Sequence, residues 1–210
     1  MSIFLYFRYF LNSVRLRGLK NTLILLRREM KYDAFFGINT KKINSKQTND
    51  YYHYQGSSYF ALFKVFDEIK KYNNEFDFFD IGCGKARALI VAEYYGFKKL
   101  FGIDLDAELI SAAENNVSER KFKKPETVFT IQTANALEFR YNNSPTIYFL
   151  FNPFGKQVLY EVVQKIMEQN KGKKKFVYLN PIHKNVFEEL GFTKETEIKT
   201  NKYLEAIVYA

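Results

Sequence analysis

The sequence predicts an α/β protein built on a mostly parallel sheet, and three observations support this prediction. From Asp77 onward, short apolar runs alternate with helical segments, which is typical of right-handed βαβ units with helices on both faces of the sheet. A glycine turn, Gly82-Cys83-Gly84, directly follows the first apolar run. The last two runs, 193–199 and 203–209, are separated by three polar residues and predict a closing antiparallel hairpin. Together these runs predict seven strands.

The hydrophobic pattern places each element of this sheet. We expect strands at residues 78–81, 100–103, 128–132, 146–151 and 175–179. We expect helices at residues 86–95, 107–116, 157–169 and 184–190, and a short helix or loop after the third strand. Because helices connect most of the strands, the sheet is predicted to be covered on both faces.

The region before the sheet divides into a helical part and a polar part. Residues 3–30 carry apolar side chains at near-helical spacing and predict one or two amphipathic helices. Residues 37–56 lose this periodicity and predict a polar connector. Ser57 or Ser58 is then expected to cap a helix that ends near Lys71.

Charge separates residues 1–50, a basic helical extension and connector, from residues 51–210, the main domain. Residues 1–50 contain ten Lys/Arg and three Asp/Glu, so they carry +7 of the net charge of +9. The main domain is therefore almost neutral. A basic amphipathic extension suits a lid over the main domain, contact with anionic membrane lipid, or contact with nucleic acid. We rank them in that order, because a neutral body favours nucleic acid least.

The chain offers few residues for disulfide or metal chemistry. Cys83 is the single cysteine, which excludes an internal disulfide and a multi-cysteine metal site. The two histidines, His53 and His183, lack ligand-like spacing, so we expect no metal. Basic residues interrupt the apolar start, so we expect neither a membrane span nor a signal peptide. The chain is predicted to be cytoplasmic, or held peripherally on the inner face of a membrane through residues 1–30.

The segment Asp80-Ile81-Gly82-Cys83-Gly84 leads from the first strand into the next helix. Glycine suits this position because the backbone turns sharply and passes close to a ligand at the carboxyl edge of the sheet. Ala86, two residues after Gly84, gives a spacing unlike that of dinucleotide-binding turns. The segment resembles the first motif of class I S-adenosylmethionine-dependent methyltransferases, which have a Rossmann-like fold. The resemblance implies that Asp80, Gly82, Cys83 and Gly84 lie in the cofactor site.

Asp104 ends the second strand, 20 residues after Gly84. A carboxylate at this place can bind both ribose hydroxyls of a nucleoside, whereas the alternative is an ordinary acid at a helix N-terminus. The segment Gly102-Ile103-Asp104-Leu105 resembles the second motif of the same family. The resemblance implies that Asp104 binds ribose and that Leu105 packs on the adenine ring.

Asn135-Ala136 follows the third strand, where the family commonly has Asp-Ala at the adenine edge. The amide oxygen of Asn135 can still accept a hydrogen bond from the exocyclic amine of adenine. The resemblance therefore implies that Asn135 and Ala136 belong to the cofactor site. The alternative is a polar turn.

Phe151-Asn152-Pro153-Phe154 ends the fourth strand and resembles the (Asp/Asn)-Pro-Pro-aromatic motif of amino-methylating enzymes. Asn152 and Pro153 match this motif, whereas Phe154 stands in place of its second proline. In those enzymes the Asn oxygen aligns the target amine. The resemblance implies catalytic roles for Asn152, Pro153 and Phe154, with Asn152 also beside the cofactor. The alternative is a turn that ends the strand.

Tyr54-Gln55-Gly56-Ser57-Ser58 enters the helix before the first strand. It resembles the Tyr-x-Pro-(Ser/Thr) segment of small bacterial methyltransferases and of seven-stranded protein-lysine methyltransferases. The resemblance implies that Tyr54, Ser57 and Ser58 contact the cofactor. Helix capping is the alternative for the two serines.

The resemblance covers residues 51–210 and implies a methyltransferase that uses S-adenosylmethionine. The acceptor is unidentified; the Asn-Pro pair slightly favours N-methylation of a protein amine, a glycan or a small metabolite. A non-catalytic module that binds S-adenosylmethionine or a nucleotide is the alternative function.

Overall fold

A computed structural model describes residues 3–41 and 55–210 of the chain. Its strands are β1 (Asp77–Ile81), β2 (Lys99–Asp104), β3 (Val128–Thr133), β4 (Thr146–Leu150), β5 (Lys174–Leu179), β6 (Lys194–Thr200) and β7 (Tyr203–Tyr209). Its helices are α1 (Ile3–Arg17), α2 (Leu19–Phe36), α3 (Tyr59–Ile69), α4 (Arg87–Tyr94), α5 (Ala107–Glu119), α6 (Lys156–Gln169) and α7 (Asn185–Glu189), with a 3₁₀ turn at Lys70–Tyr72.

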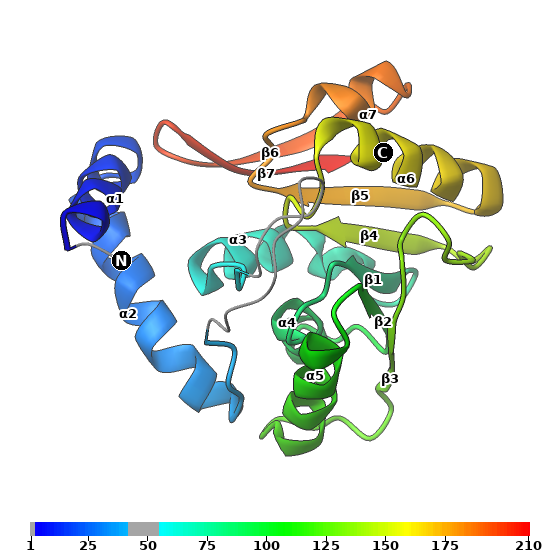
Figure 1. The fold of residues 1–210 in the computed structure, drawn as a ribbon, viewed down its shortest axis with the longest axis horizontal. Coiled ribbons are helices and arrows are strands. Elements are labelled where there is room, and N and C mark those ends of the chain that lie inside the picture. The colour runs from blue at the N-terminus through cyan, green and yellow to red at the C-terminus, as the bar shows by residue number, and fades with distance from the viewer. Residues whose placement is uncertain (1–2, 42–54) are drawn as a thin grey trace.

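The strands form one seven-stranded sheet in the order β3-β2-β1-β4-β5-β7-β6 (Figure 1). Strands β1 to β5 are parallel, whereas β7 pairs antiparallel with both β5 and β6. The predicted α/β fold, with its closing hairpin, is therefore confirmed, and the strand boundaries differ from the prediction by about one residue. The first amphipathic region forms two helices, and the second continues six residues past the predicted end, to Phe36.

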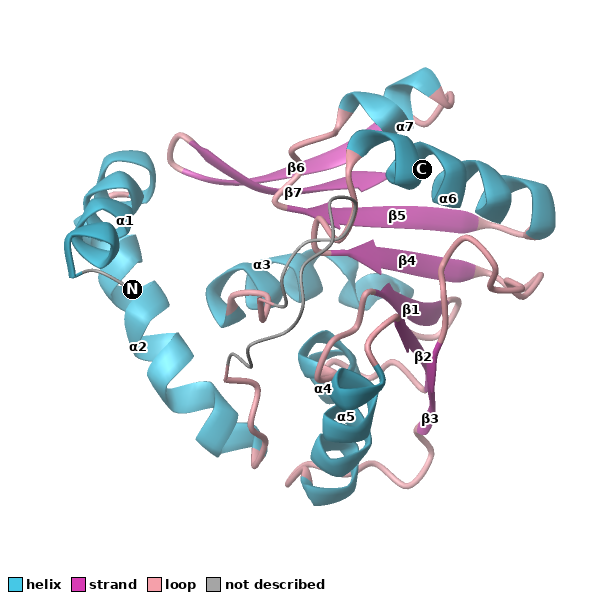
Figure 2. Ribbon diagram, in the orientation of Figure 1, coloured by secondary structure: helices cyan, strands magenta, loops and turns pink. Residues whose placement is uncertain are grey.

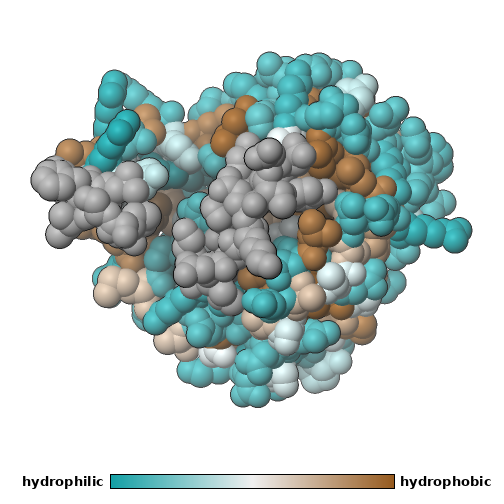
Figure 3. All heavy atoms as spheres, viewed as in Figure 1, coloured by the Kyte–Doolittle hydropathy of each residue, from teal (hydrophilic) through white to brown (hydrophobic). Residues whose placement is uncertain are grey.

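Two hydrophobic cores cover the two faces of the sheet. Successive residues of a strand point to opposite faces, so Phe78 packs with α3 and α4 in one core while Phe79 packs with α6 and α7 in the other. Strand β4 lies at the centre and is buried along its whole length. Figure 2 shows α6 and α7 along one side of the sheet, and Figure 3 shows mainly hydrophilic side chains over these two helices. Along the described helices, none is long and apolar enough to cross a bilayer.

The turn between α1 and α2 is anchored on the β6–β7 hairpin. The guanidinium of Arg17 donates to both carboxylate oxygens of Glu205, at 2.7 and 3.1 Å, and lies 3.5 Å from the centre of the Tyr203 ring. The backbone adds a hydrogen bond from the Lys202 N–H to the Leu16 carbonyl. Glu205 is 3% exposed, so the cost of burying its negative charge is offset by the pairing with Arg17.

We predict that Arg17→Ala lowers the free energy of unfolding by about 3 kcal/mol. This is the lower end of the range for breaking a buried ion pair, because the Arg17 side chain keeps 14% of its surface exposed. Urea denaturation measures the change. Arg15→Ala is the matched control: it removes an exposed arginine from the same helix and should shift stability by no more than about 0.5 kcal/mol. Equal losses in the two variants would contradict the anchoring role.

Candidate functional site

The glycine turn lies where β1, β2 and β4 end together. The N–H groups of Gly82 and Cys83 both donate to the Ile103 carbonyl, at 2.9 Å, which binds the turn to β2. Gly82 has a φ of 80°, and a Cβ atom there would lie 2.9 Å from the Cβ of Pro153, just after β4. Glycine is therefore required at this position both by the backbone conformation and by the close approach of the third strand end.

Ala86 takes the third position of the motif with a φ of 64° and no exposed surface. It is the residue from which α4 begins. A left-handed conformation is unfavourable for a residue with a Cβ atom, so the surrounding packing must hold it there. A glycine at this position would adopt the same conformation without that strain.

The Asp104 carboxylate lies beside this turn, as the sequence predicted for the edge of the sheet. One of its oxygens accepts from the Gly84 N–H at 2.9 Å, and the other accepts from the Asp106 N–H at 3.1 Å. Burial raises the pKa of Asp104, and the hydrogen bonds from Asp106 and Gly84 oppose this rise. The next residue, Leu105, is 50% exposed although it is apolar. The edge therefore combines a carboxylate with an accessible apolar side chain.

Asp80 is a buried acid at the end of β1. It is 3% exposed, and no other described residue donates a hydrogen bond to its carboxyl group. Burial, and secondarily the negative charge of Asp104, raise the pKa of Asp80 well above its usual range. A buried carboxyl group without a donor is costly to ionise, and a cation bound beside it would offset that cost.

Asn135 and Ala136 form a turn at the end of β3. The Asn135 side-chain oxygen accepts from the Leu137 N–H at 3.0 Å, and the Ala136 carbonyl accepts from the Tyr141 hydroxyl at 2.9 Å. This is the polar turn that the sequence offered as an alternative. The second lone pair of the Asn135 oxygen leaves it able to accept a further hydrogen bond.

Asn152 follows β4 with a φ of 43° and is 8% exposed. Its side-chain oxygen accepts a 2.6 Å hydrogen bond from the hydroxyl of Tyr178, on the neighbouring strand β5. The ring of Tyr178 is fully buried, whereas its hydroxyl reaches the edge of the sheet. Of the two remaining motif residues, Pro153 contacts the glycine turn and Phe154 is buried in the α6 and α7 core.

A second Asn-Pro pair repeats this arrangement one strand further along. Asn180 follows β5 with a φ of 49°, and its side-chain oxygen accepts from the Tyr203 hydroxyl at 3.0 Å. The repetition shows that a left-handed Asn held by a tyrosine hydroxyl is a way of ending strands in this sheet. Asn152 differs from Asn180 in its position directly beside the glycine turn.

Arg87, in the first turn of α4, is a buried arginine that is 8% exposed. Its guanidinium pairs with Glu29 at 2.7 Å and donates to the Ser57 carbonyl at 2.7 Å. It also lies 3.4 Å from Asp33 and 4.2 Å from the centre of the Tyr59 ring. The spacing of Glu29 and Asp33, four residues apart on one face of α2, is a signal by which the sequence could have indicated this contact.

Lys85 and Asn116 extend the same contact toward the glycine turn. The Lys85 ammonium donates to the Lys41 carbonyl at 2.8 Å. The Asn116 side chain donates to the Lys85 carbonyl at 3.0 Å and accepts from the Asn39 N–H at 2.9 Å. Hydrogen bonds with Lys85 and Asn116 thus hold the stretch after α2, at Asn39 and Lys41, beside the glycine turn.

The serines before α3 have unequal environments. Ser58 caps α3, because its hydroxyl accepts from the Ala61 N–H at 3.3 Å, so its capping alternative is observed. Ser57 is buried, and its carbonyl is held by Arg87. Tyr54 lies outside the described residues. Within residues 3–41 and 55–210, no group of three or more His, Cys, Asp or Glu side chains is arranged to hold a metal ion.

No protein-family model matches the chain. Over 61 residues, 29% of its length, the chain is 38% identical to the ribosomal protein L11 methyltransferase of Lachnospira eligens. The matched segment spans about a fifth (19%) of that relative's length.

Solved structures share the fold at low sequence identity. The chain is similar to the ribosomal protein L11 methylase from Lactobacillus delbrueckii subsp. bulgaricus, with a TM-score of 0.54, 13% identity, and coverage of 71% of this chain and 75% of that one. It is also similar to the magnesium protoporphyrin IX methyltransferase from Synechocystis with bound S-adenosylmethionine, with a TM-score of 0.53, 10% identity, and coverage of 90% and 94%. A third similar structure is a TehB-like S-adenosylmethionine-dependent methyltransferase from Corynebacterium glutamicum. Its TM-score is 0.51 at 14% identity, with coverage of 70% of this chain and 86% of that one. The chain therefore has the fold of class I S-adenosylmethionine-dependent methyltransferases.

We predict that Asp80→Asn stabilises the ligand-free protein at neutral pH. Because the pKa of Asp80 is raised in the folded state, that state holds its proton at pH values where the unfolded chain has released it. Folding must therefore take up a proton at Asp80, and this lowers the stability as the pH rises above the usual Asp range, near 4. The gain in the free energy of unfolding should be present at pH 7 and shrink toward pH 4. Denaturation curves at several pH values measure it, and a gain independent of pH would contradict this account of Asp80.

Proposed function

We propose that this protein is a methyltransferase that binds S-adenosylmethionine at the carboxyl edge of β1, β2 and β3. The observation that carries the proposal is the hydrogen bond between the Gly84 N–H and the Asp104 carboxylate, which puts the glycine turn and an acid in one place. The shared fold supports the proposal, and so do the names of the relatives, some of which were solved with S-adenosylmethionine or S-adenosylhomocysteine.

The described residues suit this cofactor. Asp80 offers a buried carboxyl group for the ammonium of the methionine part, where a positive charge would lower the cost of its ionisation. Asp104 keeps lone pairs for the ribose hydroxyls, and Leu105 offers an exposed apolar surface for the adenine ring. We assign Asn135 and Ala136 to the adenine edge, and Gly82, Cys83 and Gly84 to the turn around the methionine part. Tyr54, Ser57 and Ser58 are proposed to contact the cofactor as well.

Methyl transfer needs alignment more than acid or base chemistry. When bound, S-adenosylmethionine supplies a methyl group on a positively charged sulfur, and the acceptor attacks it directly. We propose that Asn152, together with Pro153 and Phe154, aligns the acceptor. Asn152 lies at the edge beside Gly82. Its oxygen suits a donor such as an amine, so N-methylation is the reaction we favour. The acceptor is a protein amine, a glycan or a small metabolite.

The extension of residues 1–50 is proposed to act as a lid for this site. Its helix α2 lies on the side of the sheet toward which β4 points (Figure 1). Glu29 and Asp33 fix that helix to Arg87, three residues after Gly84. Closing an edge of this kind excludes water and holds the substrate in place.

The experiment that tests the cofactor is a thermal shift measurement with S-adenosylmethionine, S-adenosylhomocysteine and NAD. S-adenosylhomocysteine should raise the melting temperature and NAD should not, because a ligand stabilises the state that it binds. Asp104→Ala should then weaken S-adenosylhomocysteine binding by about 1–3 kcal/mol in calorimetric titration. Asp67→Ala, at an exposed acid of α3, is the control with the same charge change. A shift with NAD alone would exclude the proposal.

A non-catalytic binding module is the second function, because the Tyr178 hydroxyl already holds the Asn152 oxygen. Three variants distinguish alignment from a purely structural role. Asn152→Gly accepts the positive φ and removes the side chain, so it should fold, keep its affinity for S-adenosylhomocysteine and lose about a hundredfold or more in turnover. Asn152→Asp keeps an acceptor oxygen and should retain more activity. Tyr178→Phe should have an intermediate effect, because Asn152 loses a partner but remains in place.

These variants can be measured by transfer of radiolabelled methyl groups into cell lysate, with calorimetric titration of S-adenosylhomocysteine alongside. Loss of cofactor affinity in Asn152→Gly would contradict its assignment to the acceptor. No methyl transfer by the wild-type protein, together with tight S-adenosylhomocysteine binding, would favour the non-catalytic module.

A further inference from the structure

Helix α2 carries an exposed apolar stripe on its outer side. Four large side chains recur at helical spacing along one face and are strongly exposed: Leu19 (55%), Leu23 (52%), Leu26 (44%) and Met30 (85%). Figure 1 shows α1 and α2 as the outermost elements on their side of the molecule. An exposed stripe of this kind on a helix that packs against the protein with its other face marks an interaction surface.

Basic side chains line one edge of the stripe. Lys20, Arg27 and Lys31 are exposed and lie on the next face of α2, by their spacing of seven and four residues. Among the described residues, none of them forms an ion pair or a side-chain hydrogen bond. We call these three residues and the four of the stripe the outer face of α2.

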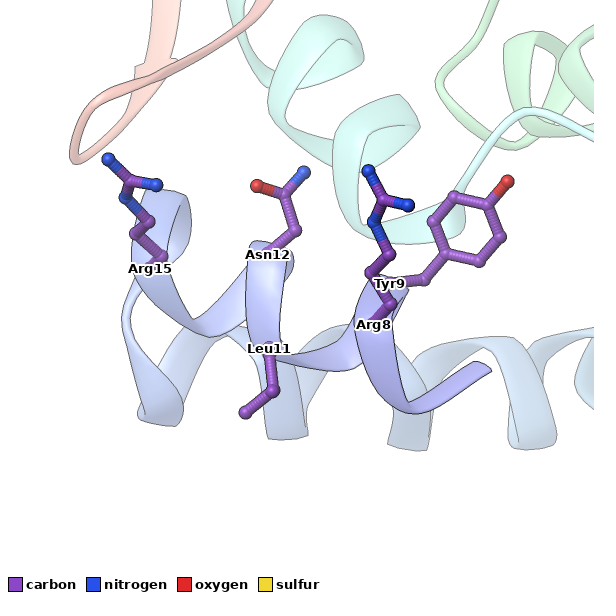
Figure 4. Close-up of a pocket in the computed structure, with 5 residues that line it drawn as sticks. All are labelled: Arg8, Tyr9, Leu11, Asn12 and Arg15. Carbon is purple, nitrogen blue, oxygen red and sulfur yellow. The ribbon is translucent and has the colours of Figure 1, made fainter. Parts of the chain in front are cut away.

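The two acids of α2 are only partly exposed, with 30% and 15% of their side-chain surface accessible. Glu29 and Asp33 are the two acids of the helix, and both pair with Arg87. Helix α1 contains no acid at all. Its exposed Arg8 and Arg15 point to one side together with Asn12, and Leu11 points to the other (Figure 4). The exposed charges on both described helices are therefore all positive.

We propose that the outer face of α2 docks on a membrane surface that contains anionic lipid. An apolar stripe beside a row of cations is the pattern of a helix that lies in the plane of the lipid headgroups. The stripe enters the boundary of the acyl chains while the cations meet lipid phosphates. A second copy of this chain is a poorer partner, since two such faces would bring cations together. The proposal does not depend on the methyltransferase activity.

Co-sedimentation of the full chain with vesicles tests the proposal. Vesicles of phosphatidylcholine with about one third phosphatidylglycerol should bind the protein. Vesicles of phosphatidylcholine alone should bind it more weakly, by about tenfold or more. High salt should reduce binding, because it screens the attraction of the cations. Equal binding to both kinds of vesicle, or none to the anionic ones, would overturn the proposal.

Two sets of variants separate the two parts of the face. Lys20→Gln/Arg27→Gln/Lys31→Gln and, separately, Leu19→Gln/Leu23→Gln should each lower binding to anionic vesicles by about tenfold or more. The control is Lys98→Gln/Lys99→Gln/Lys173→Gln, which removes the same charge from exposed positions of the main domain. It should bind as the wild type does.

Other partners give distinct results in the same experiments. Binding to an oligonucleotide that is lost in the basic variant, with no effect of the leucine variant and no vesicle binding, would assign the face to nucleic acid. A dimer in sedimentation equilibrium that dissociates in the leucine variant, again without vesicle binding, would assign it to a second copy. Both outcomes would overturn the membrane proposal. Circular dichroism of each variant should show the same overall helix content as the wild type.

Discussion

The 2.9 Å hydrogen bond from the Gly84 N–H to the Asp104 carboxylate holds together the edge on which the rest of this site depends. Parallel pairing aligns β1 with β2, so the turn after one strand reaches the last residue of the other. The contact of Gly82 with Pro153 then brings in the end of β4. Three strand ends therefore converge on one short turn, and the close approach leaves no room for a Cβ atom at its first glycine.

The basic extension is part of the folded molecule at two widely separated places. Arg17 anchors the turn between α1 and α2 to the closing hairpin through Glu205. Arg87 holds α2 beside the glycine turn through Glu29. Each anchor is an arginine–carboxylate pair with one buried partner, Glu205 in the first and Arg87 in the second. Breaking either pair is costly because it takes a partner away from a buried charge. Helix α2 therefore has an inner face fixed by ion pairs and an outer face free to meet a partner.

Unfavourable local features gather at the carboxyl edge. Asp80 is a buried acid without a donor among the described residues, while Ala86 and Asn152 hold left-handed backbone conformations. Each of these lowers the stability of the folded chain, and the hydrophobic cores on the two faces of the sheet offset them. Such features cluster at functional sites more than elsewhere, which supports the proposed cofactor site at this edge.

The sequence by itself determined the order and type of the elements, because apolar periodicity and the glycine turn are local signals that survive without tertiary contacts. It also placed Asp104 at the same edge as the turn, since parallel strands share a carboxyl end. Only the tertiary structure decided that Arg87 is buried, that Tyr178 holds Asn152 and that α2 leaves an apolar stripe exposed. These contacts join residues between 26 and 58 positions apart, or depend on which face of a helix is covered. Periodicity along the chain does not contain that information, because it records which face of an element is apolar and not what packs against it.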